Sequence, residues 1–482
     1  MKDVVINIGH SAVAKVLMIG VQLCAATILA RNLTADDYGI VGFANIIMAL
    51  LLRLNGMGLT QAVIRSPALT QRTLGTAATL NMVFSVLAFL CAQLLAPVAG
   101  WFLNSPASVP VVRVLAFGFL LNPLGFLPTC LLNREMRFGA LRTPSVIGAG
   151  VRGVVAVAMA LSGWKYWSLV YGNLMGTLTA NSLLQVFRRV PFHRGFNYTE
   201  ARKLLNFGVP ITLVGLVTFV VFNADSFLIG LSLGTTILGY YTVALTWATF
   251  SSTVLQEVVH SVLFPKFSQM QTDVQRMRDA YLRTLKIVAF SAALMNIGLF
   301  VVADGFLVNV LGKGSSRWLP AYDVLRILCV YGFVRAVVET VGNPIMAFGE
   351  SNLLLKASTI AAVVEVTLLP LAVRSFGILG ASFLVTVAYS LQCIVYVPFL
   401  AKTLRINFRH ILEVLLPSTV GAVGGVVLAY AWPHANSLSW GDMLLRGSLF
   451  AAGFVLIHEL LSGAAACVEV RAIWRSVVNP SG

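Results

Sequence analysis

Long apolar runs alternate with short polar segments along the whole chain. Each run reaches about 20 residues, the length that an α-helix needs to cross the hydrocarbon core of a bilayer. The pattern therefore predicts an all-α polytopic membrane protein with about 14 transmembrane helices. The expected spans are 8–30, 39–63, 76–98, 110–131, 144–162, 166–187, 207–232, 237–263, 286–311, 321–348, 354–373, 377–400, 411–432 and 443–462.

The polar segments between these spans alternate in charge. Lysines and arginines concentrate in one set, at 65–72, 134–142, 188–203, 266–286, 402–409 and 471–475. The intervening set holds little beyond Arg31, Lys165, Lys313, Arg317 and Arg374. Cytoplasmic loops carry an excess of lysine and arginine, so the first set, and with it both termini, is expected in the cytoplasm. This orientation requires an even number of spans.

The chain also shows signs of an internal duplication. An offset of 200 positions lays Leu233, Gly234 and Gly239 on Leu33, Thr34 and Gly39, and an offset of 213 pairs Arg326 with Arg113. Repeats of this length are typical of the two halves of a transporter. We expect two pseudo-symmetric six-helix lobes, 1–187 and 207–400, a basic cytoplasmic linker at 188–206, and two additional helices with a cytoplasmic tail at 401–482.

Composition and motifs narrow the class of protein. The 482 residues are 58% hydrophobic and 11% charged, with a mean hydropathy of +0.86 and a formal net charge of +16. The cations lie in short loops between spans instead of a basic domain, so nucleic acid is not an expected partner. The six cysteines form no CxxC pair and the chain has no P-loop or G-x-S-x-G motif, so we expect no metal site, cofactor or enzyme activity. The first span is expected to be a helix of the mature protein and not a cleaved signal.

Five cations are candidates for contact with a ligand. Lys15, Arg53, Arg113 and Arg152 fall within the first-half spans, where no spanning acid offers a partner, and Arg326 follows in the second half. An unpaired cation in hydrocarbon costs at least about 2.5 to 3.5 kcal/mol, so these side chains should line a wet cavity or bind an anion. Arginine suits phosphate through its planar fork of donors. Lys15, Arg113 and Arg326 are also close enough to span ends to reach the interface instead, so the deeper Arg53 and Arg152 carry the sharper prediction.

Acidic residues inside the spans are candidates for coupling or ion pairing. Asp225 follows Asn223 in the middle of an apolar run, and an intramembrane carboxylate is a functional candidate. Arg335 and Glu339 are four residues apart on one helix and are expected to pair with each other. Glu257 and Glu365 fit either a coupling site for H⁺ or Na⁺ or a partner for an arginine, and the sequence does not decide between these roles.

Several segments resemble one known family in the right order. They are LARNLTADDYGIVGFA (29–44), LTQRTLGTAATLN (69–81), LNREMRF (132–138), LLNFGVPI (204–211), NADSFLIG (223–230), LGYYTVA (238–244) and VLFPKFSQMQ (262–271). Together they are similar to the polysaccharide transporter (Wzx-type) family of the MOP flippase superfamily. One departure is the segment from Arg53 to Leu59, which lacks the acidic residue that the family often has there.

The resemblance implies a fold and an activity. The fold would be two six-helix lobes around a cationic cavity plus two C-terminal helices. The activity would be alternating-access transfer of an undecaprenyl-pyrophosphate-linked oligosaccharide across the bacterial inner membrane, for exopolysaccharide or O-antigen export. Membrane lipids, and the polymerase and export machinery of the same pathway, would be partners.

Three other functions remain as alternatives. A cation-coupled multidrug or small-molecule antiporter of the same superfamily would need an acidic cavity, whereas the charges here are mostly basic. A membrane polysaccharide polymerase or glycosyltransferase would need a sizeable outside loop, which the pattern does not provide. A structural scaffold of an export complex would not need cations within the spans.

Overall fold

The computed structural model describes residues 20, 22–66, 69–103, 105–190, 195–259, 273–432 and 438–462. These residues form helices and no strands, which confirms the all-α class. Within the described ranges, nine helices are long and apolar enough to cross a membrane, and two of these, Tyr198–Glu257 and Asn352–Thr403, are long enough to cross it twice. The chain is thus a multi-pass membrane protein, whereas the count of fourteen spans stays a prediction. Lys15 and most of the first expected span lie outside the described residues.

The described residues divide by their internal contacts into two compact units, one ending at Gly239 and the other starting at Tyr240. We call these the N-terminal and C-terminal units. The boundary at 239 follows the seventh expected span and does not coincide with the basic segment 188–206. Segment 207–239 therefore packs with the N-terminal helices. The division into lobes 1–187 and 207–400 stays a prediction.

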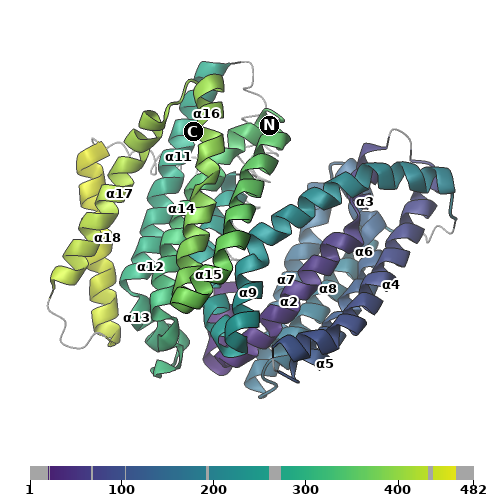
Figure 1. Cartoon of the computed structure of the whole chain (residues 1–482), viewed down its shortest axis with the longest axis horizontal. Helices are drawn as coiled ribbons and strands as arrows, with labels where there is room; N and C mark the ends of the chain where they lie inside the picture. Colours follow the sequence, from purple (N-terminus) through teal and green to yellow (C-terminus); the bar gives the residue numbers. More distant parts are fainter. Residues whose placement is uncertain are drawn as a thin grey trace. The chain divides into compact units, whose positions relative to one another are not determined.

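The N-terminal unit is a bundle of antiparallel helices (Figure 1). Its elements are α2 (Ala35–Gly56), α3 (Leu59–Arg65), α4 (Gln71–Phe102), α5 (Ser108–Leu115), α6 (Phe117–Arg134), α7 (Phe138–Leu161), α8 (Trp167–Phe187) and the first part of α9 (Tyr198–Val258). Helix α7 packs along α8, and α6 packs against both α4 and α8. Short segments join α6 to α7 and α7 to α8, as the alternation of apolar and polar segments predicts.

Local sequence explains where the first helices begin and end. Thr34 caps α2 through a reciprocal pair of bonds with Asp37, and Thr70 accepts a hydrogen bond from the Thr73 amide at the start of α4. Helix α2 ends at Met57 and Gly58, which both adopt left-handed backbone conformations with φ of 37° and 60°. The chain then continues as α3, so the second expected span is a helix with an interruption near its end.

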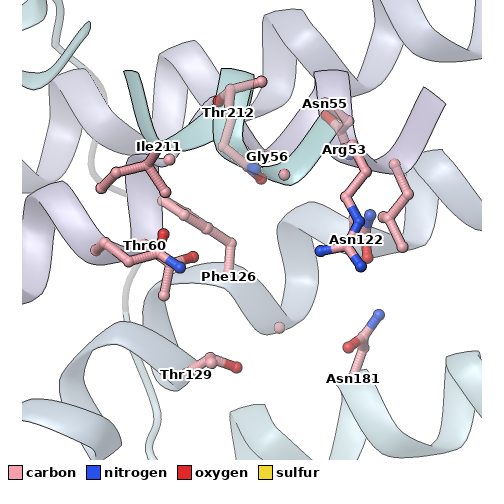
Figure 2. Close-up of a pocket in the computed structure, with 16 residues that line it drawn as sticks. Arg53, Asn55, Gly56, Thr60, Asn122, Phe126, Thr129, Asn181, Ile211 and Thr212 are labelled. Atoms are coloured by element: carbon pink, nitrogen blue, oxygen red, sulfur yellow. The ribbon is translucent and has the colours of Figure 1, made fainter. Parts of the chain in front are cut away.

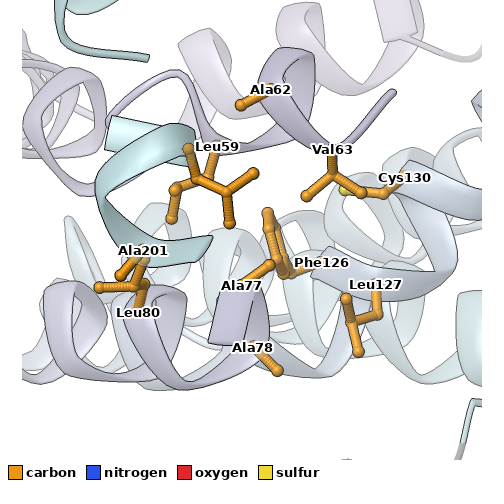
Figure 3. Close-up of a cluster of buried hydrophobic side chains, with 11 residues drawn as sticks. Leu59, Ala62, Val63, Ala77, Ala78, Leu80, Phe126, Leu127, Cys130 and Ala201 are labelled. Atoms are coloured by element: carbon orange, nitrogen blue, oxygen red, sulfur yellow. The ribbon is translucent and has the colours of Figure 1, made fainter. Parts of the chain in front are cut away.

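A cluster of buried apolar side chains joins α3, α4, α6 and the start of α9 (Figure 3). Leu59 and Val63 of α3 are fully buried, and Phe126 and Cys130 of α6 pack beside them. In a bilayer, close packing and not transfer from water holds helices together, so the small residues of α4 matter here as much as the large ones. Cys130 lies in this core, as expected for a cysteine that acts as a small apolar residue.

The tightest helix contact in this unit involves the positions related by the 200-residue offset. Helix α9 breaks at Gly234, where φ is 82° and ψ is 178°. A Cβ added to Gly39 would overlap the carbonyl oxygen of Thr235, and one added to Gly239 would overlap that of Ala35. Residues 35 and 39 thus meet residues 239 and 235 reciprocally. The hydroxyl of Thr235 also donates a hydrogen bond to Asp36.

The C-terminal unit contains the rest of α9, α11 (Val274–Ala292), α12 (Gly298–Val301), α13 (Ala303–Gly305), α14 (Tyr322–Ala347), α15 (Ser351–Ser390), α16 (Gln392–Thr403), α17 (Phe408–Ala431) and α18 (Trp440–Ser462). Between α11 and α14 the chain forms π-helical turns at Ala293–Ile297 and Phe306–Leu311 and a 3₁₀ turn at Ser316–Ala321. A second glycine break, at Gly377 with φ of 58°, divides α15 near the predicted boundary between two spans.

Helices α17 and α18 pack along each other (Figure 1). Phe450 and Phe454 of α18 contribute to a core with Ala293 and Val301. The guanidinium of Arg446, whose side chain is only 2% exposed, lies 2.9 Å from Asp304 Oδ2 and 2.7 Å from Asp442 Oδ2. The sequence analysis did not identify this ion cluster, which joins α18 to α13.

The reciprocal glycine contact predicts a specific sensitivity. We expect Gly39→Ala and Gly239→Ala each to destabilise the purified protein by about 1 to 3 kcal/mol, because the added methyl group forces two backbones apart. Thermal unfolding in detergent measures this loss. Gly150→Ala on α7 is the matched control, since nothing lies within 4 Å of a Cβ added there. Equal melting temperatures for Gly39→Ala and Gly150→Ala would contradict the prediction.

Candidate functional site

A cavity of about 340 Å³ opens in the N-terminal unit where α2 ends and α3 begins. Helices α2, α3, α4, α6, α8 and the first part of α9 all contribute to its wall (Figure 2). The lining residues are Leu52, Arg53, Asn55, Gly56, Gly58, Thr60, Gln61, Asn81, Asn122, Gly125, Phe126, Thr129, Asn181, Ile211, Thr212 and Gly215. Within a membrane-spanning bundle, a wall this polar indicates a space that holds water or a polar ligand.

Close backbone contacts shape the cavity. A Cβ added to Gly58 would lie 2.6 Å from the Cα atom of Gly208, so the turn after α2 touches the start of α9 directly. About two turns after Gly208 on the same helix, Gly215 faces Arg53. A Cβ added to Gly215 would lie 3.8 Å from the Arg53 Cδ atom. The absence of a side chain at Gly215 therefore leaves room for the arginine beside α9.

Arg53 supplies the only cationic side chain of the lining. It lies in the last turn of α2 and is exposed, and its guanidinium extends beside Asn122 with Asn181 across from it (Figure 2). No carboxylate lines the cavity, and Arg53 has no ion pair within the described part of the chain. An arginine in this setting can offer several donors at once to an anionic group.

Carboxamide and hydroxyl groups make up most of the remaining polar wall. The buried Asn55 accepts a hydrogen bond of 3.2 Å from the Ser85 hydroxyl, and Asn181 donates one of 2.9 Å to the Leu121 carbonyl. These bonds hold the two amides in place. The Oδ1 atom of Asn81, by contrast, is buried without a hydrogen-bond partner among the described residues. Such groups can both donate to and accept from the hydroxyls of a polar ligand.

The other predicted cations of this unit lie elsewhere. Arg152 is on α7 and packs over α8, where a Cβ added to Gly176 would lie 3.3 Å from its Nε atom. Arg113 is exposed on α5, and its backbone carbonyl accepts a hydrogen bond from Gln93. Neither residue lines the cavity around Arg53. A ligand role for Arg152, Arg113 and Lys15 stays a prediction.

Asp225 and Asn223 lie in the first part of α9, away from the cavity lining. The Asp225 side chain is 3% exposed, and its Oδ1 accepts a hydrogen bond of 2.6 Å from the Ser226 amide. Asn223 donates to the Phe219 carbonyl one turn earlier. Two residues after Asp225, Phe227 stacks on Phe43 of α2, with ring centroids 5.6 Å apart. The buried carboxylate is therefore part of the helix that contacts α2.

The predicted ion pair on α14 is confirmed. The Arg335 Nε atom lies 2.8 Å from Glu339 Oε1, and the Tyr389 hydroxyl donates a hydrogen bond of 3.2 Å to the same oxygen. Glu365 is buried on α15, and Glu257 is exposed on α9. The structure does not bring these carboxylates into one of the described cavities, and their coupling role stays a prediction.

Arg326 lies at a separate and mostly apolar cavity of about 470 Å³ in the C-terminal unit. Its guanidinium is centred 4.1 Å above the Phe300 ring, and Nη1 donates to the Tyr322 hydroxyl at 3.1 Å. Cation–π contact and one hydrogen bond thus hold the side chain. Of the two arginines that the 213-residue offset pairs, Arg326 is partly exposed near the start of α14 and Arg113 is exposed in the last turn of α5.

Sequence reasoning missed most of the cavity wall. Asn81, Asn122, Asn181 and Thr129 are single uncharged polar residues in apolar spans. Such residues are common in membrane helices, where they bond their own backbone or a neighbour, so each one alone is a weak signal. An asparagine in the third, fourth and sixth expected spans is the one pattern in this wall that could have indicated a shared cavity.

Comparison with known proteins identifies the family. Residues 28–323 match the model of the polysaccharide biosynthesis protein family, which is more than half of the chain. The chain belongs to this family. The lipopolysaccharide biosynthesis protein WzxC of Escherichia coli is 24% identical over 432 residues, covering 87% of this chain and 86% of WzxC. The succinoglycan biosynthesis transport protein ExoT of Rhizobium meliloti is 26% identical, covering 68% of this chain and 66% of ExoT.

Solved structures place this member of the family in a broader fold group. The lipid II flippase MurJ, in an inward closed conformation, matches with a TM-score of 0.76 over 94% of this chain and 99% of that one, at 12% identity. A multidrug transporter of the MATE family, in the MOP superfamily, matches with a TM-score of 0.63. The resemblance found in the sequence is thereby confirmed at the level of family and fold. The relatives are transporters and not enzymes.

Arg53 provides the direct test of the cavity. We expect Arg53→Ala to lower polysaccharide output by about tenfold or more, because a charge-assisted hydrogen bond contributes about 1.5 to 3 kcal/mol. Arg53→Lys should retain part of the output. The measurement is surface polysaccharide in cells whose only copy of this gene carries the variant, at matched protein level in the membrane. Arg142→Ala, an exposed arginine of α7 outside the cavity, is the control, and an equal loss in both variants would refute the assignment.

Proposed function

We propose that this protein is a flippase that moves an undecaprenyl-pyrophosphate-linked oligosaccharide across the bacterial inner membrane for exopolysaccharide or O-antigen export. The observation that carries the proposal is the cavity around Arg53, which combines one unpaired guanidinium with a wall of amides and hydroxyls. An anionic group and sugar hydroxyls need those two kinds of contact. The family and the named roles of WzxC, ExoT and MurJ support it.

In this proposal the sugar and phosphate groups enter the cavity while the polyprenyl chain remains in the bilayer. The cavity then opens to the other side by alternating access, as in other transporters built from repeated halves. The glycine breaks at 234 and 377 interrupt the long helices α9 and α15, and such points can absorb changes of backbone angle when helices move.

The proposed orientation follows the positive-inside rule, with both termini in the cytoplasm. The C-terminal ends of α6 and α8, which carry Arg134, Arg188 and Arg189, then lie at the cytoplasmic side. Membrane lipids surround the spans, and the polymerase and export machinery of the same pathway would take up the product.

A cation-coupled multidrug antiporter is the second candidate, because MATE transporters share the fold. An exporter of organic cations needs carboxylates in its cavity to attract them. The cavity lining here contains Arg53 and no acidic residue. We therefore favour an anionic substrate, whereas the antiporter would prefer a cationic one.

Reconstitution of the purified full chain tests both candidates. We expect vesicles containing the protein to move an undecaprenyl-pyrophosphate-linked oligosaccharide between leaflets, measured as the fraction of sugar accessible to an enzyme added outside. Protein-free vesicles give the baseline, and Arg53→Ala vesicles should approach it. Uptake of a fluorescent organic cation in place of the lipid-linked sugar would favour the antiporter and refute the flippase.

The coupling proposal concerns Asp225 and Glu257. We propose that H⁺ or Na⁺ binds near one of these carboxylates and offsets charge on the return step. Asp225→Asn is then expected to abolish export while the protein still inserts normally, because a neutral amide cannot release and rebind the cation. The measurement is polysaccharide output together with membrane abundance. Full complementation by Asp225→Asn would refute the proposal for this residue. Charge reversal at Asp225, together with a compensating charge reversal at Arg53 or Arg152, would separate a role in ion pairing from a role in coupling.

A further inference from the structure

A second cavity in the N-terminal unit, of about 620 Å³, is lined by three arginines and several apolar side chains. It is bounded by the start of α4 and by the C-terminal ends of α6 and α8. Its lining residues are Leu69, Gln71, Leu74, Leu131, Arg134, Glu135, Arg188, Arg189 and Val190. No residue is shared with the cavity around Arg53. We call it the basic rim cavity.

The wall of the basic rim cavity has two chemically different parts. Three arginines face one carboxylate, so the polar part carries excess positive charge. The apolar part consists of leucines and a valine, and Leu69, Leu74 and Val190 also pack against the buried core of α3, α4 and α6. A cavity with cations on one side and a fixed apolar surface on the other matches a phosphate group attached to a hydrocarbon chain.

The three arginines are held differently. Arg134 donates to the backbone carbonyl of Ser66, which fixes its position beside the cavity. Arg188 is held by Glu135, with Nη2 at 2.9 Å and Nε at 3.1 Å from Glu135 Oε1. Arg189 is exposed and has no ion pair or hydrogen bond within the described ranges. Arg189 is therefore the cation that is available to a ligand.

The pair between Arg188 and Glu135 also bears on ligand binding. The Arg188 side chain is 41% exposed and the Glu135 side chain is 34% exposed. Exposed pairs of this kind contribute only about 0 to 1 kcal/mol. A phosphate can therefore compete with Glu135 for Arg188, and a guanidinium can meet it with two parallel hydrogen bonds. Gln71, in the first turn of α4, adds a neutral donor at the positive end of a 32-residue helix.

We propose that the basic rim cavity binds the phosphate or pyrophosphate headgroup of an anionic lipid, with the first part of the lipid chain against Leu74, Leu131 and Val190. On the proposed orientation this cavity lies at the cytoplasmic surface, where anionic headgroups meet basic residues near the ends of spans. The headgroup comes from a membrane phospholipid or from the polyprenyl-linked substrate before it enters the Arg53 cavity. Both sources present the same chemistry to Arg189.

The experiment measures binding by the purified full chain in neutral detergent. Three probes are titrated, namely phosphatidylglycerol, undecaprenyl pyrophosphate and inorganic pyrophosphate, and apparent Kd values are obtained by native mass spectrometry. The undecaprenyl pyrophosphate titration uses the Arg53→Ala background, so that the Arg53 cavity does not contribute. We expect Arg189→Gln to weaken binding of at least one chain-bearing probe by about fivefold, the effect of one cation near an anionic headgroup.

Two further variants make the result specific. Arg142→Gln removes an exposed arginine of α7 outside the basic rim cavity and should leave Kd unchanged. Glu135→Gln should tighten binding, because it removes the carboxylate and frees Arg188, a result that mere loss of folding cannot produce. An effect of Arg189→Gln on phosphatidylglycerol alone assigns a membrane phospholipid, and an effect on undecaprenyl pyrophosphate alone assigns the substrate lipid.

Two outcomes would overturn the proposal. Equal weakening by Arg189→Gln and Arg142→Gln would mean diffuse attraction to positive charge and no site. Inorganic pyrophosphate binding as tightly as the chain-bearing probes would mean that the apolar wall takes no part. These outcomes are independent of transport, since a protein that binds lipid here but does not translocate oligosaccharide would keep this inference and lose the proposed function.

Discussion

The N-terminal unit depends on the contact in which Gly39 meets Thr235 and Gly239 meets Ala35. Adding 200 to residue numbers 35 and 39 gives 235 and 239, so each contact is the counterpart of the other in the proposed repeat. An interface between two identical subunits pairs residues in the same reciprocal way. Helices in lipid gain little from burying apolar surface and associate by close packing, which requires small residues at the crossing. A glycine at both positions permits the contact, and the hydrogen bond from Thr235 to Asp36 adds a polar link beside it.

This crossing determines where the cavity lies. Helices α2 and α9 touch at Gly39 and Thr235 and again, near the other end of α2, at Gly58 and Gly208. Since both ends are held, the stretch of α2 before the second contact must face α9 across a fixed gap. Arg53 lies in that stretch, opposite the side-chain-free Gly215. The polar wall follows from this position, because an arginine inside a helical bundle needs water or polar groups around it.

Sequence periodicity predicts the helices and the pairing of Arg335 with Glu339, because each depends on the spacing of residues along one chain segment. The 200-residue offset indicates a duplication but does not predict that Gly39 and Gly239 contact the opposite segment. Periodicity does not predict the contact of Arg446 with Asp304, since Asp304 comes from α13 and reaches Arg446 of α18 only through tertiary packing. The pair of Asp442 and Arg446 has the same i,i+4 spacing as Arg335 and Glu339, but the sequence analysis did not single it out. Arg152 shows the same limit. Its depth in a span is visible in the sequence, but its direction toward α8, and not toward the Arg53 cavity, depends on which helices surround α7.

The composition of the Arg53 cavity also bears on how a transporter of this kind releases its ligand. A site must bind strongly enough to fill and weakly enough to empty on the other side. A ring of arginines would hold a pyrophosphate tightly in a space of low dielectric constant, and release would then be slow. One guanidinium combined with Asn81, Asn122 and Asn181 divides the interaction among neutral hydrogen bonds, each with a net contribution of about 1 kcal/mol. Water can replace these bonds one at a time, so the same wall that recognises a sugar also lets it leave.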